Sequence, residues 1–451
     1  MQRLLSVESL RSYVSSYGDL FRCHRRSNEK KVFQYLSGLF HDGKHNIERM
    51  NERVFDSHYG ALQHFISDSP WDHRLVLSAV AQDISKLFAD SSDPVGLLID
   101  ESGHRKRGSH SVGVSRQYLG SIGKVDNGQV GVFAALSQGA NVGMVDARLF
   151  LPKEWSNNKS RCAKAGIPLE EQIYRTKPEL ALEMISHMGD QIHYDWVGGD
   201  SIYGNSPTLR KGLQRLGRRF VMDVSEKQEV FLVDPMPYIP SSSGKGRKKS
   251  SWVSDHKSIK VKDLVQNLKQ EDWTIYTVRK GTKGPIQRAC YITDVYIWSA
   301  KRVTTSEVER LRLIISRNLD GSQLKYSLTN DHELQGKSQL SDQQLLYRQM
   351  QRYWVERGFQ NLKDAIGMTE YQVRGWRAWY HHITLTIMAL HYMLEQKIKA
   401  KNEIPLLSCH DIKLFFALTL QRKSQDPAKV WQLIETRHQQ RQADLDRYNL
   451  K

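Results

Sequence analysis

Cysteine is scarce in this 451-residue chain, and the four cysteines are widely separated. Each of Cys23, Cys162, Cys290 and Cys409 lies more than a hundred residues from the next, and none belongs to a CxxC or Cys/His spacing. Disulfide frameworks and most structural zinc sites require cysteines in recognisable clusters. The sequence therefore argues against both.

Long apolar runs are also absent. No apolar run reaches the roughly 20 residues needed for a membrane-spanning helix. Residues 1–6 lack the apolar middle and the small-residue cleavage site of a secretory signal. We therefore expect no membrane segment and a cytoplasmic protein.

Acidic residues are outnumbered, because 49 Asp and Glu stand against 66 Lys and Arg, with a net charge of +17. Such a surplus favours a polyanionic partner, and the soluble helices and strands predicted here favour nucleic acid over a membrane surface. The length allows two to four domains with a large core.

The stretch Val95-Gly96-Leu97-Leu98-Ile99-Asp100 predicts a strand that is buried on both faces and closed by a carboxylate. The carboxyl ends of central strands are where α/β sheets place ligands and chemistry. An acid that simply leaves a core strand for solvent is the structural alternative for Asp100. A second apolar strand, predicted over residues 192–199, also ends in an aspartate, Asp200.

The order of predicted elements defines the expected fold class. Strands are expected near residues 95–100, 129–136 and 142–151, and a helix, a strand, a helix and a strand follow between residues 177 and 224. This order predicts an α/β fold with a mixed sheet and flanking helices. Asp100 and Asp200 can meet only if the first and fourth strands are neighbours.

The two ends of the chain, residues 1–90 and those beyond 399, are predicted to be helical. The N-terminal segment carries one basic cluster, which comprises Arg22, Arg25, Arg26, Lys30 and Lys31. This segment is either a DNA-binding module or a helical support. The C-terminal helices could serve oligomerisation or further DNA contact.

Residues 225–335 interrupt this pattern with a β-rich segment. From residue 244 to residue 288 there are twelve Lys or Arg and four Asp or Glu, so positive charge concentrates here. Cations interleaved with aromatic residues suit a surface that follows a phosphate backbone and stacks on exposed bases. Lys248, Lys249 and Trp298 are therefore expected DNA contacts, and a solvated edge sheet is the alternative.

A helix predicted over residues 345–366 carries the third candidate acid. Arg352, Glu356 and Lys363 fall at i, i+4 and i+11, which places them on one stripe of this helix. Phe359, on the same edge, is expected to seat the stripe against the sheet. An ordinary i, i+4 ion pair between Arg352 and Glu356 is the alternative.

Together, Asp100, Asp200 and Glu356 form a candidate metal site. Carboxylate oxygens are preferred by Mg²⁺, and two ions about 3.5 to 4 Å apart can activate the attacking oxygen and stabilise the leaving oxygen in phosphodiester cleavage. We expect two Mg²⁺ ions, with Mn²⁺ able to substitute. The basic chain makes a nucleic-acid backbone the expected substrate.

The chain resembles the DDE-type transposases of bacterial insertion sequences over roughly residues 20–400. The resemblance is carried by Leu98-Ile99-Asp100-Glu101-Ser102-Gly103, by residues 110–118 (HSVGVSRQY), by Gly199-Asp200-Ser201-Ile202-Tyr203-Gly204 and by residues 375–382 (GWRAWYHH). It implies an RNase H-like catalytic fold, interrupted by a β-strand insertion before the glutamate helix. It also implies that Asp100, Asp200 and Glu356 are the catalytic triad.

The family signature places a tyrosine three residues before Arg352, where this chain has Gln349; Tyr347 or Tyr353 is a possible substitute. By resemblance, Arg352 and Lys363 would contact phosphates near the scissile bond, and Tyr353 is a further expected DNA contact.

The resemblance also implies a division into segments. Residues 1–90 would form the N-terminal domain, and residues 91–224 with 336–398 the catalytic domain. Residues 225–335 would form the insertion, and residues 399–451 the helical tail.

The activity that follows is cut-and-paste transposition. The protein would bind terminal inverted repeats, hydrolyse phosphodiester bonds and join the ends to target DNA, as a homodimer associated with the bacterial nucleoid. An RNase H-like nuclease without strand transfer, or a DNA-binding regulator derived from a transposase, are the alternatives.

Overall fold

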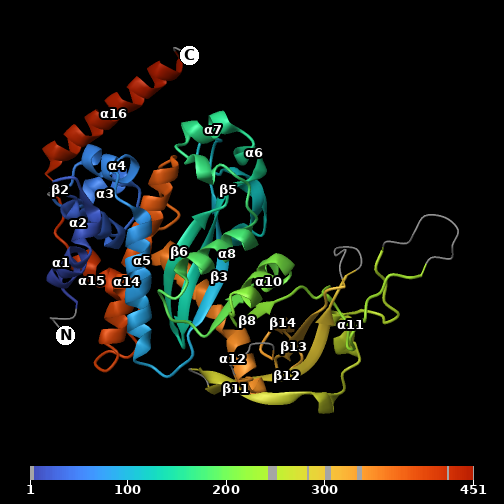
Figure 1. Ribbon diagram of the computed structural model, residues 1–451. Coiled ribbons are helices and arrows are strands. Elements are labelled where there is room, and N and C mark those ends of the chain that lie inside the picture. Colours follow the sequence, from blue (N-terminus) through green and yellow to red (C-terminus); the bar gives the residue numbers. More distant parts are fainter. Residues whose placement is uncertain are drawn as a thin grey trace.

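The strand that contains Asp100 lies inside a ten-stranded sheet (Figure 1). The computed structural model describes residues 5–241, 251–281, 284–299, 306–332, 338–423 and 426–449. In it, β3 (Gly96–Arg105) pairs in parallel with β7 (Trp196–Gly199) and antiparallel with β5 (Lys124–Gln138). The predicted first and fourth strands are therefore neighbours, as the meeting of their acids requires.

The other strands of this sheet pair on either side of β3, β5 and β7. Beyond β7 lies the parallel strand β8 (Phe220–Asp223), and β5 also pairs with β6 (Asn141–Leu149) and β4 (Ser115–Leu119), both antiparallel. In the order β6-β5-β3-β7-β8, only β5 runs against the other four strands. This is the mixed, RNase H-like sheet predicted from the sequence.

The register between β3 and β7 positions the two aspartates. Ile99 lies opposite Gly199, so Asp100 and Asp200 are the next residues along two adjacent parallel strands. The strands approach closely, because a Cβ atom on Gly96 would lie 2.5 Å from the indole of Trp196. Both acids therefore leave the apolar layer at the same edge of the sheet.

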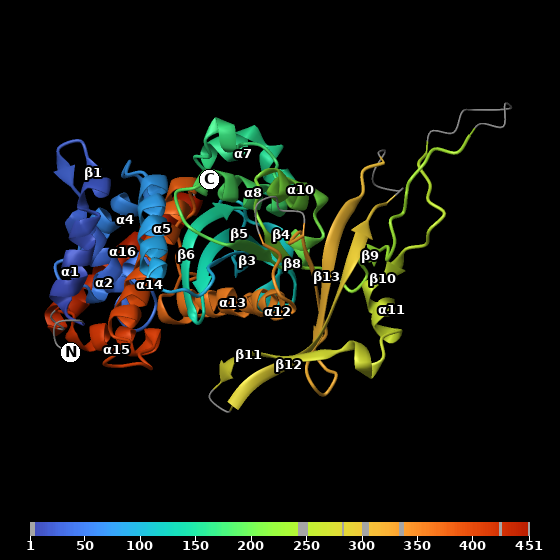
Figure 2. The same cartoon turned by 60° about the horizontal axis from the view of Figure 1, so that its bottom comes forward.

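Helices cover both faces of this sheet (Figure 2). Figure 2 shows α8 (Lys177–Met188) and α10 (Pro207–Arg215) on one side, and α12 (Asp342–Gln351) and α13 (Tyr353–Gln360) on the other. As predicted, Phe359 seats α13 on the sheet, with its ring centroid 5.2 Å from that of Phe133 on β5.

The long helix α14 (Trp376–Lys399) is buried along most of its length. A Cβ atom on Gly143 of β6 would touch both Ile84 of α5 (His73–Ala89) and Leu394 of α14, so these two helices pack on the sheet. Among the described residues, none of the helices has both the length and the apolar character that crossing a bilayer demands.

The N-terminal helices pack on the other side of α14. They are α1 (Val7–Ser16), α2 (Glu29–Phe40), α3 (Ile47–Arg53) and α4 (Tyr59–Ser67). The Tyr13 hydroxyl donates to the Met388 carbonyl at 2.9 Å, and the Tyr35 hydroxyl lies 2.8 Å from His382 Nδ1. The helical character predicted for residues 1–90 is confirmed, and their status as a separate domain stays a prediction.

The insertion extends the same sheet. Its strands β11 (Thr274–Gly281), β12 (Gly284–Ile297), β13 (Glu309–Arg317) and β14 (Lys325–Thr329) form an antiparallel series, and β14 pairs with β8. The β-rich character predicted for residues 225–335 is confirmed. The pairing of β14 with β8 joins the insertion directly to the strands that carry Asp100 and precede Asp200.

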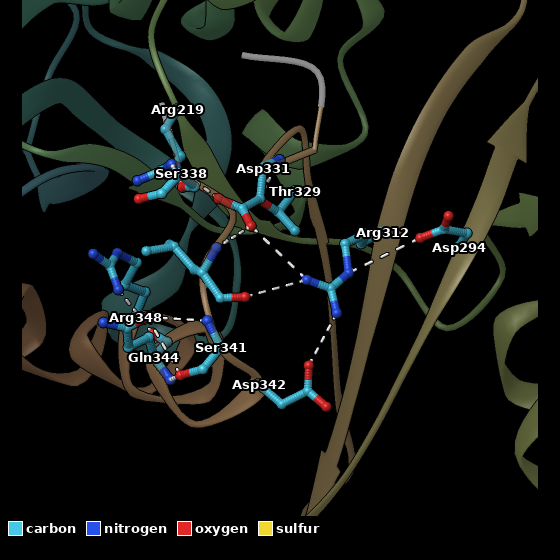
Figure 3. A network of polar contacts seen from close by, with 11 residues as sticks. Arg219, Asp294, Arg312, Thr329, Asp331, Ser338, Ser341, Asp342, Gln344 and Arg348 are labelled. Atoms are coloured by element: carbon cyan, nitrogen blue, oxygen red, sulfur yellow. Dashed lines mark hydrogen bonds and ion pairs between the residues drawn. The ribbon is translucent and has the colours of Figure 1, made fainter. Parts of the chain in front are cut away.

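A buried polar network holds the insertion against α12 (Figure 3). Arg312 of β13 contacts Asp342 at 2.9 Å and Asp331 at 3.8 Å, and Arg219 lies 2.8 Å from the other oxygen of Asp331. Asp331 also accepts from the Leu340 backbone N–H at 2.7 Å. Because a buried carboxylate is stable only when paired and hydrogen-bonded, this network fixes the start of α12 relative to β13.

Several expectations about elements were wrong. The strand expected to end at Asp100 continues to Arg105, because its pairing with β5 extends that far. From residue 95 onward, three strands were expected before the next α-helix, whereas the structure has four, because β4 was missed. The strand predicted over residues 192–199 begins only at Trp196, since Asp195 instead accepts the Val95 backbone N–H at 2.7 Å. The short helix α11 (Val261–Gln266) was also missed.

Several further elements complete the described part of the chain. They are β1 (Arg22–Cys23), β2 (Arg26–Ser27), α6 (Lys153–Ser156), α7 (Lys159–Lys164), α9 (Ser201–Gly204), β9 (Glu229–Val230), β10 (Ile259–Lys260), α15 (Cys409–Thr419) and α16 (Pro427–Asn449). The helical character of the C-terminal tail is confirmed.

Candidate active site

Asp100 and Asp200 converge at the edge of the sheet. Their carboxylate oxygens, together with one of Glu101, all lie within 4.8 Å of one another. Asp200 also caps α9, since its Oδ1 accepts the Ile202 backbone N–H at 2.9 Å. The cap fixes this carboxylate at the strand end, beside Asp100 and Glu101.

The electrostatics of this cluster favour a cation. Burial, opposed by Arg352 and reinforced by Asp200, raises the pKa of Asp100 to about 7. Burial and the nearby Glu101 also raise the pKa of Asp200. Since both shifts disfavour ionised carboxylates, a divalent cation bound here would relieve a charge that the protein alone does not balance.

Glu101 is the acid that the sequence did not single out. Its carboxylate belongs to the same cluster as those of Asp100 and Asp200. There it lies 2.8 Å from Lys177 Nζ and accepts from the Tyr203 hydroxyl at 3.0 Å. Each of these two donors contacts one oxygen of the Glu101 carboxylate, and together they hold it beside Asp100 and Asp200.

Arg352 connects the third predicted acid to the first. It lies at the junction of α12 and α13, with Nη2 3.1 Å from Glu356 Oε1 and Nη1 3.6 Å from Asp100 Oδ2. The structure therefore brings Glu356 to the same guanidinium group as Asp100. The Glu356 side chain is 54% exposed and lies outside the cluster formed by Asp100, Glu101 and Asp200.

Asp223 is a further acid at the site, and Arg352 Nε lies 3.0 Å from its Oδ2. It is the last residue of β8, and Asp200 directly follows β7, so the run Phe220-Val221-Met222-Asp223 carried the same strand-end signal. Its backbone lies close to α9, because a Cβ atom on Gly204 would be 1.9 Å from the Asp223 carbonyl oxygen. Glycine at position 204 is thus needed for this approach.

Gln349, which replaces the family's tyrosine, has a buried structural role. It accepts from Ser316 Oγ at 2.6 Å and donates to Ser327 Oγ at 2.9 Å. The nearby Tyr353 is 39% exposed, and the Arg279 guanidinium lies 5.0 Å from its ring centroid.

The predicted DNA contacts are placed differently from one another. Lys363 lies in a π-helical turn, η5 (Asn361–Ala365), where burial, opposed by Asp100, lowers its pKa. Trp298 is 8% exposed and packs near Phe231, with ring centroids 6.3 Å apart. Lys248 and Lys249 lie outside the described residues. DNA contact by any of these residues stays a prediction.

The strand order, with aspartates directly after β7 and within β3, defines an RNase H-like domain. The chain belongs to the family of DDE superfamily endonucleases, whose family model matches residues 19–285. This range includes Asp100 and Asp200 and ends before Glu356. The resemblance to DDE-type transposases, stated above from sequence motifs, is thereby confirmed.

The chain is also 36% identical over 204 residues to the probable transposase for insertion sequence element IS701 from Microchaete diplosiphon. This match covers 45% of the present chain and 49% of that relative, so it spans about half of either protein. A solved piggyBac transposase synaptic complex with hairpin DNA shows a TM-score of 0.40 and 12% identity, covering 92% of this chain and 77% of that chain.

Proposed function

We propose that this protein is a metal-dependent DNA transposase. It binds the terminal inverted repeats of its element, hydrolyses phosphodiester bonds to expose 3′ hydroxyls, and joins these hydroxyls to target DNA. The observation that carries the proposal is the convergence of Asp100 and Asp200 within 4.8 Å, with Glu356 linked to Asp100 through Arg352.

The donor set fits Mg²⁺ or Mn²⁺. Asp100, Asp200 and Glu356 offer only carboxylate oxygens, the ligands these hard cations prefer, and burial raises the pKa of Asp100 to about 7. A bound pair of ions would activate the attacking oxygen and stabilise the leaving oxygen. These three residues would hold the ions.

The protein's own groups would position the DNA. Arg352 and Lys363 would neutralise phosphate charge beside the carboxylates, since a fixed guanidinium or ammonium group is most effective in a partly buried site. Lys177 and Tyr203 hold Glu101, and Asp200 is held by its cap on α9, so the strand ends stay rigid. Water in the first step and a DNA hydroxyl in the second would use the same in-line geometry.

Further basic groups support a DNA partner. Arg22, Arg25 and Arg26 are exposed around the two-stranded β1–β2 ribbon, and the whole chain has a net charge of +17. We propose that the N-terminal helices and the insertion contact the element ends, that two copies act together, and that the protein works at the nucleoid.

The test is a plasmid that carries two element ends, incubated with purified protein in Mg²⁺. Wild-type protein should produce end cleavage and joined products, whereas Asp100→Asn, Asp200→Asn and Glu356→Gln should produce neither while retaining DNA binding. Asp190→Asn, which removes an exposed acid paired with Arg218 away from the site, is the matched control and should keep activity. Cleavage without joining would indicate the nuclease, and binding without cleavage by wild-type protein would indicate the regulator.

A further inference from the structure

Arg352 is surrounded by carboxylates, and the shortest of its contacts is to Asp223. Its Nε lies 3.0 Å from Asp223, whereas its terminal nitrogens lie 3.1 Å from Glu356 and 3.6 Å from Asp100. Glu356 and Asp100 are residues that the proposed function needs as metal ligands. The Arg352 guanidinium therefore pairs with two carboxylates that a bound metal ion would also need.

We propose that Asp223 is a positioning residue that retains Arg352 at the site when a divalent cation displaces it from Asp100 and Glu356. The inference rests on the proposed function. It gives Asp223, which no sequence motif singled out, a defined role in metal binding: it is the carboxylate partner that remains to the guanidinium once the other two bind metal.

A chain of hydrogen bonds fixes the Asp223 carboxylate in the required orientation. Ser327 donates to Asp223 Oδ1 at 2.6 Å, Gln349 donates to Ser327 at 2.9 Å, and Ser316 donates to Gln349 at 2.6 Å. Arg288 donates to Ser316 at 3.2 Å, which completes the chain in β12. Since the donors point in one direction throughout, Asp223 Oδ2 is left free for Arg352.

The members of this chain are deeply buried. Ser316, Ser327, Gln349 and Arg288 are at most 2% exposed, and polar groups at such positions keep one arrangement because leaving them unpaired is costly. Asp223 is consequently a prepared acceptor, and its orientation does not depend on Arg352.

Electrostatics explain why Arg352 needs such an acceptor. Burial lowers the pKa of Arg352, and the four carboxylates, with Asp223 the largest contributor, more than offset this and raise it. The guanidinium thus stays charged and must keep a carboxylate partner. Without Asp223, its remaining ion-pair partners would be Asp100 and Glu356, and it would compete with the metal for them.

The experiment measures Mn²⁺ binding to the full-length protein without DNA, by isothermal titration calorimetry. Arg352→Gln removes the competitor and should tighten binding about fivefold, whereas Asp223→Asn should weaken it about fivefold, as expected for coupled charged neighbours. In the Arg352→Gln background, Asp223→Asn should change the dissociation constant less than about twofold, because Asp223 acts through the arginine.

Equal effects of Asp223→Asn in the two backgrounds would overturn the inference, because they would reflect only the loss of a negative charge. Weaker Mn²⁺ binding by Arg352→Gln would overturn it as well. Ser327→Ala, which removes the donor to Asp223 and keeps all charges, should weaken binding in the same direction and serves if Asp223→Asn fails to fold. Asp190→Asn, at an exposed acid paired with Arg218, is the control and should bind as wild type does.

One further variant separates this inference from the proposed function. Asp100→Asn should abolish tight Mn²⁺ binding if these carboxylates form the metal site. Wild-type affinity in Asp100→Asn would refute the proposed function itself. Loss of binding in that variant, with additive effects of Asp223 and Arg352, would refute only the role of Asp223.

Discussion

Replacing Asp100 with asparagine should stabilise the metal-free protein at neutral and basic pH. Asparagine has nearly the same shape, cannot ionise, and can still accept the Glu101 backbone N–H that Asp100 Oδ1 accepts at 2.8 Å. The substitution removes the ion pair between Asp100 and Arg352, which at 3.6 Å is the longest of that arginine's three ion pairs. The substitution therefore removes mainly the cost of a buried charge.

The magnitude follows from the pKa of Asp100, which burial raises to about 7, whereas an unfolded aspartate has a value of about 3.9. The folded state binds the proton more tightly, so the wild-type protein is most stable when Asp100 is protonated. That stability is lost as the pH rises from about 4 to about 7, and three units correspond to about 4 kcal/mol. Allowing for the lost Arg352 contact, we expect Asp100→Asn to raise the free energy of unfolding by about 2 to 4 kcal/mol at pH 8.

The assay is thermal unfolding of both proteins in EDTA at pH 4.5 and at pH 8. The melting temperature of Asp100→Asn should exceed that of wild type by several degrees at pH 8 and by little at pH 4.5. Addition of Mn²⁺ should raise the melting temperature of wild type only. A variant that is less stable than wild type at pH 8, or a difference that does not depend on pH, would refute this reasoning.

Three other predictions follow from the site. Glu101→Gln should reduce DNA cleavage less than about tenfold while Asp200→Asn abolishes it, because Glu101 is already occupied by two donors; equal losses in a cleavage assay would make Glu101 a ligand. Gly204→Ala should lower the melting temperature and the cleavage rate, since its Cβ would collide with the Asp223 carbonyl, whereas Gly120→Ala, which has open space around it, should do neither. Lys363→Ala should weaken binding of end DNA in fluorescence anisotropy and reduce the salt dependence of log Kd by about one ion; an unchanged slope would exclude a phosphate contact.

The fold was predictable where hydrophobic pattern and chain order agree. The buried runs before Asp100 and before Asp200 were recognisable because each is apolar and is followed by an acid, and parallel neighbours then bring the acids together. The stripe of Arg352, Glu356 and Lys363 followed from helical periodicity. Phe359 completed this pattern, and its packing against Phe133 bears it out.

Partners that depend on distant strands were not predictable. Asp223 showed the strand-end signal, yet its contact with Arg352 depends on β14 pairing with β8 and on Ser327 facing the site. Glu101 was hidden because its place in the cluster depends on Lys177 and Tyr203, which lie well beyond it along the chain and meet it only in the fold. Gln349 could be noted only as a departure from a family pattern, since its partners Ser316 and Ser327 belong to strands of the insertion.

The ladder between β14 and β8 restricts how the chain tolerates changes in length. Ser327 lies opposite Asp223, and sliding either strand by one residue would turn the serine hydroxyl to the other side of the sheet. A single-residue deletion within Lys325–Thr329 should therefore be far more damaging than one placed at residues 120–123 between β4 and β5, where Gly120 and Gly123 have open space around them. Natural and engineered length variants of this protein are accordingly expected to accumulate at hairpin tips and to spare this five-residue strand.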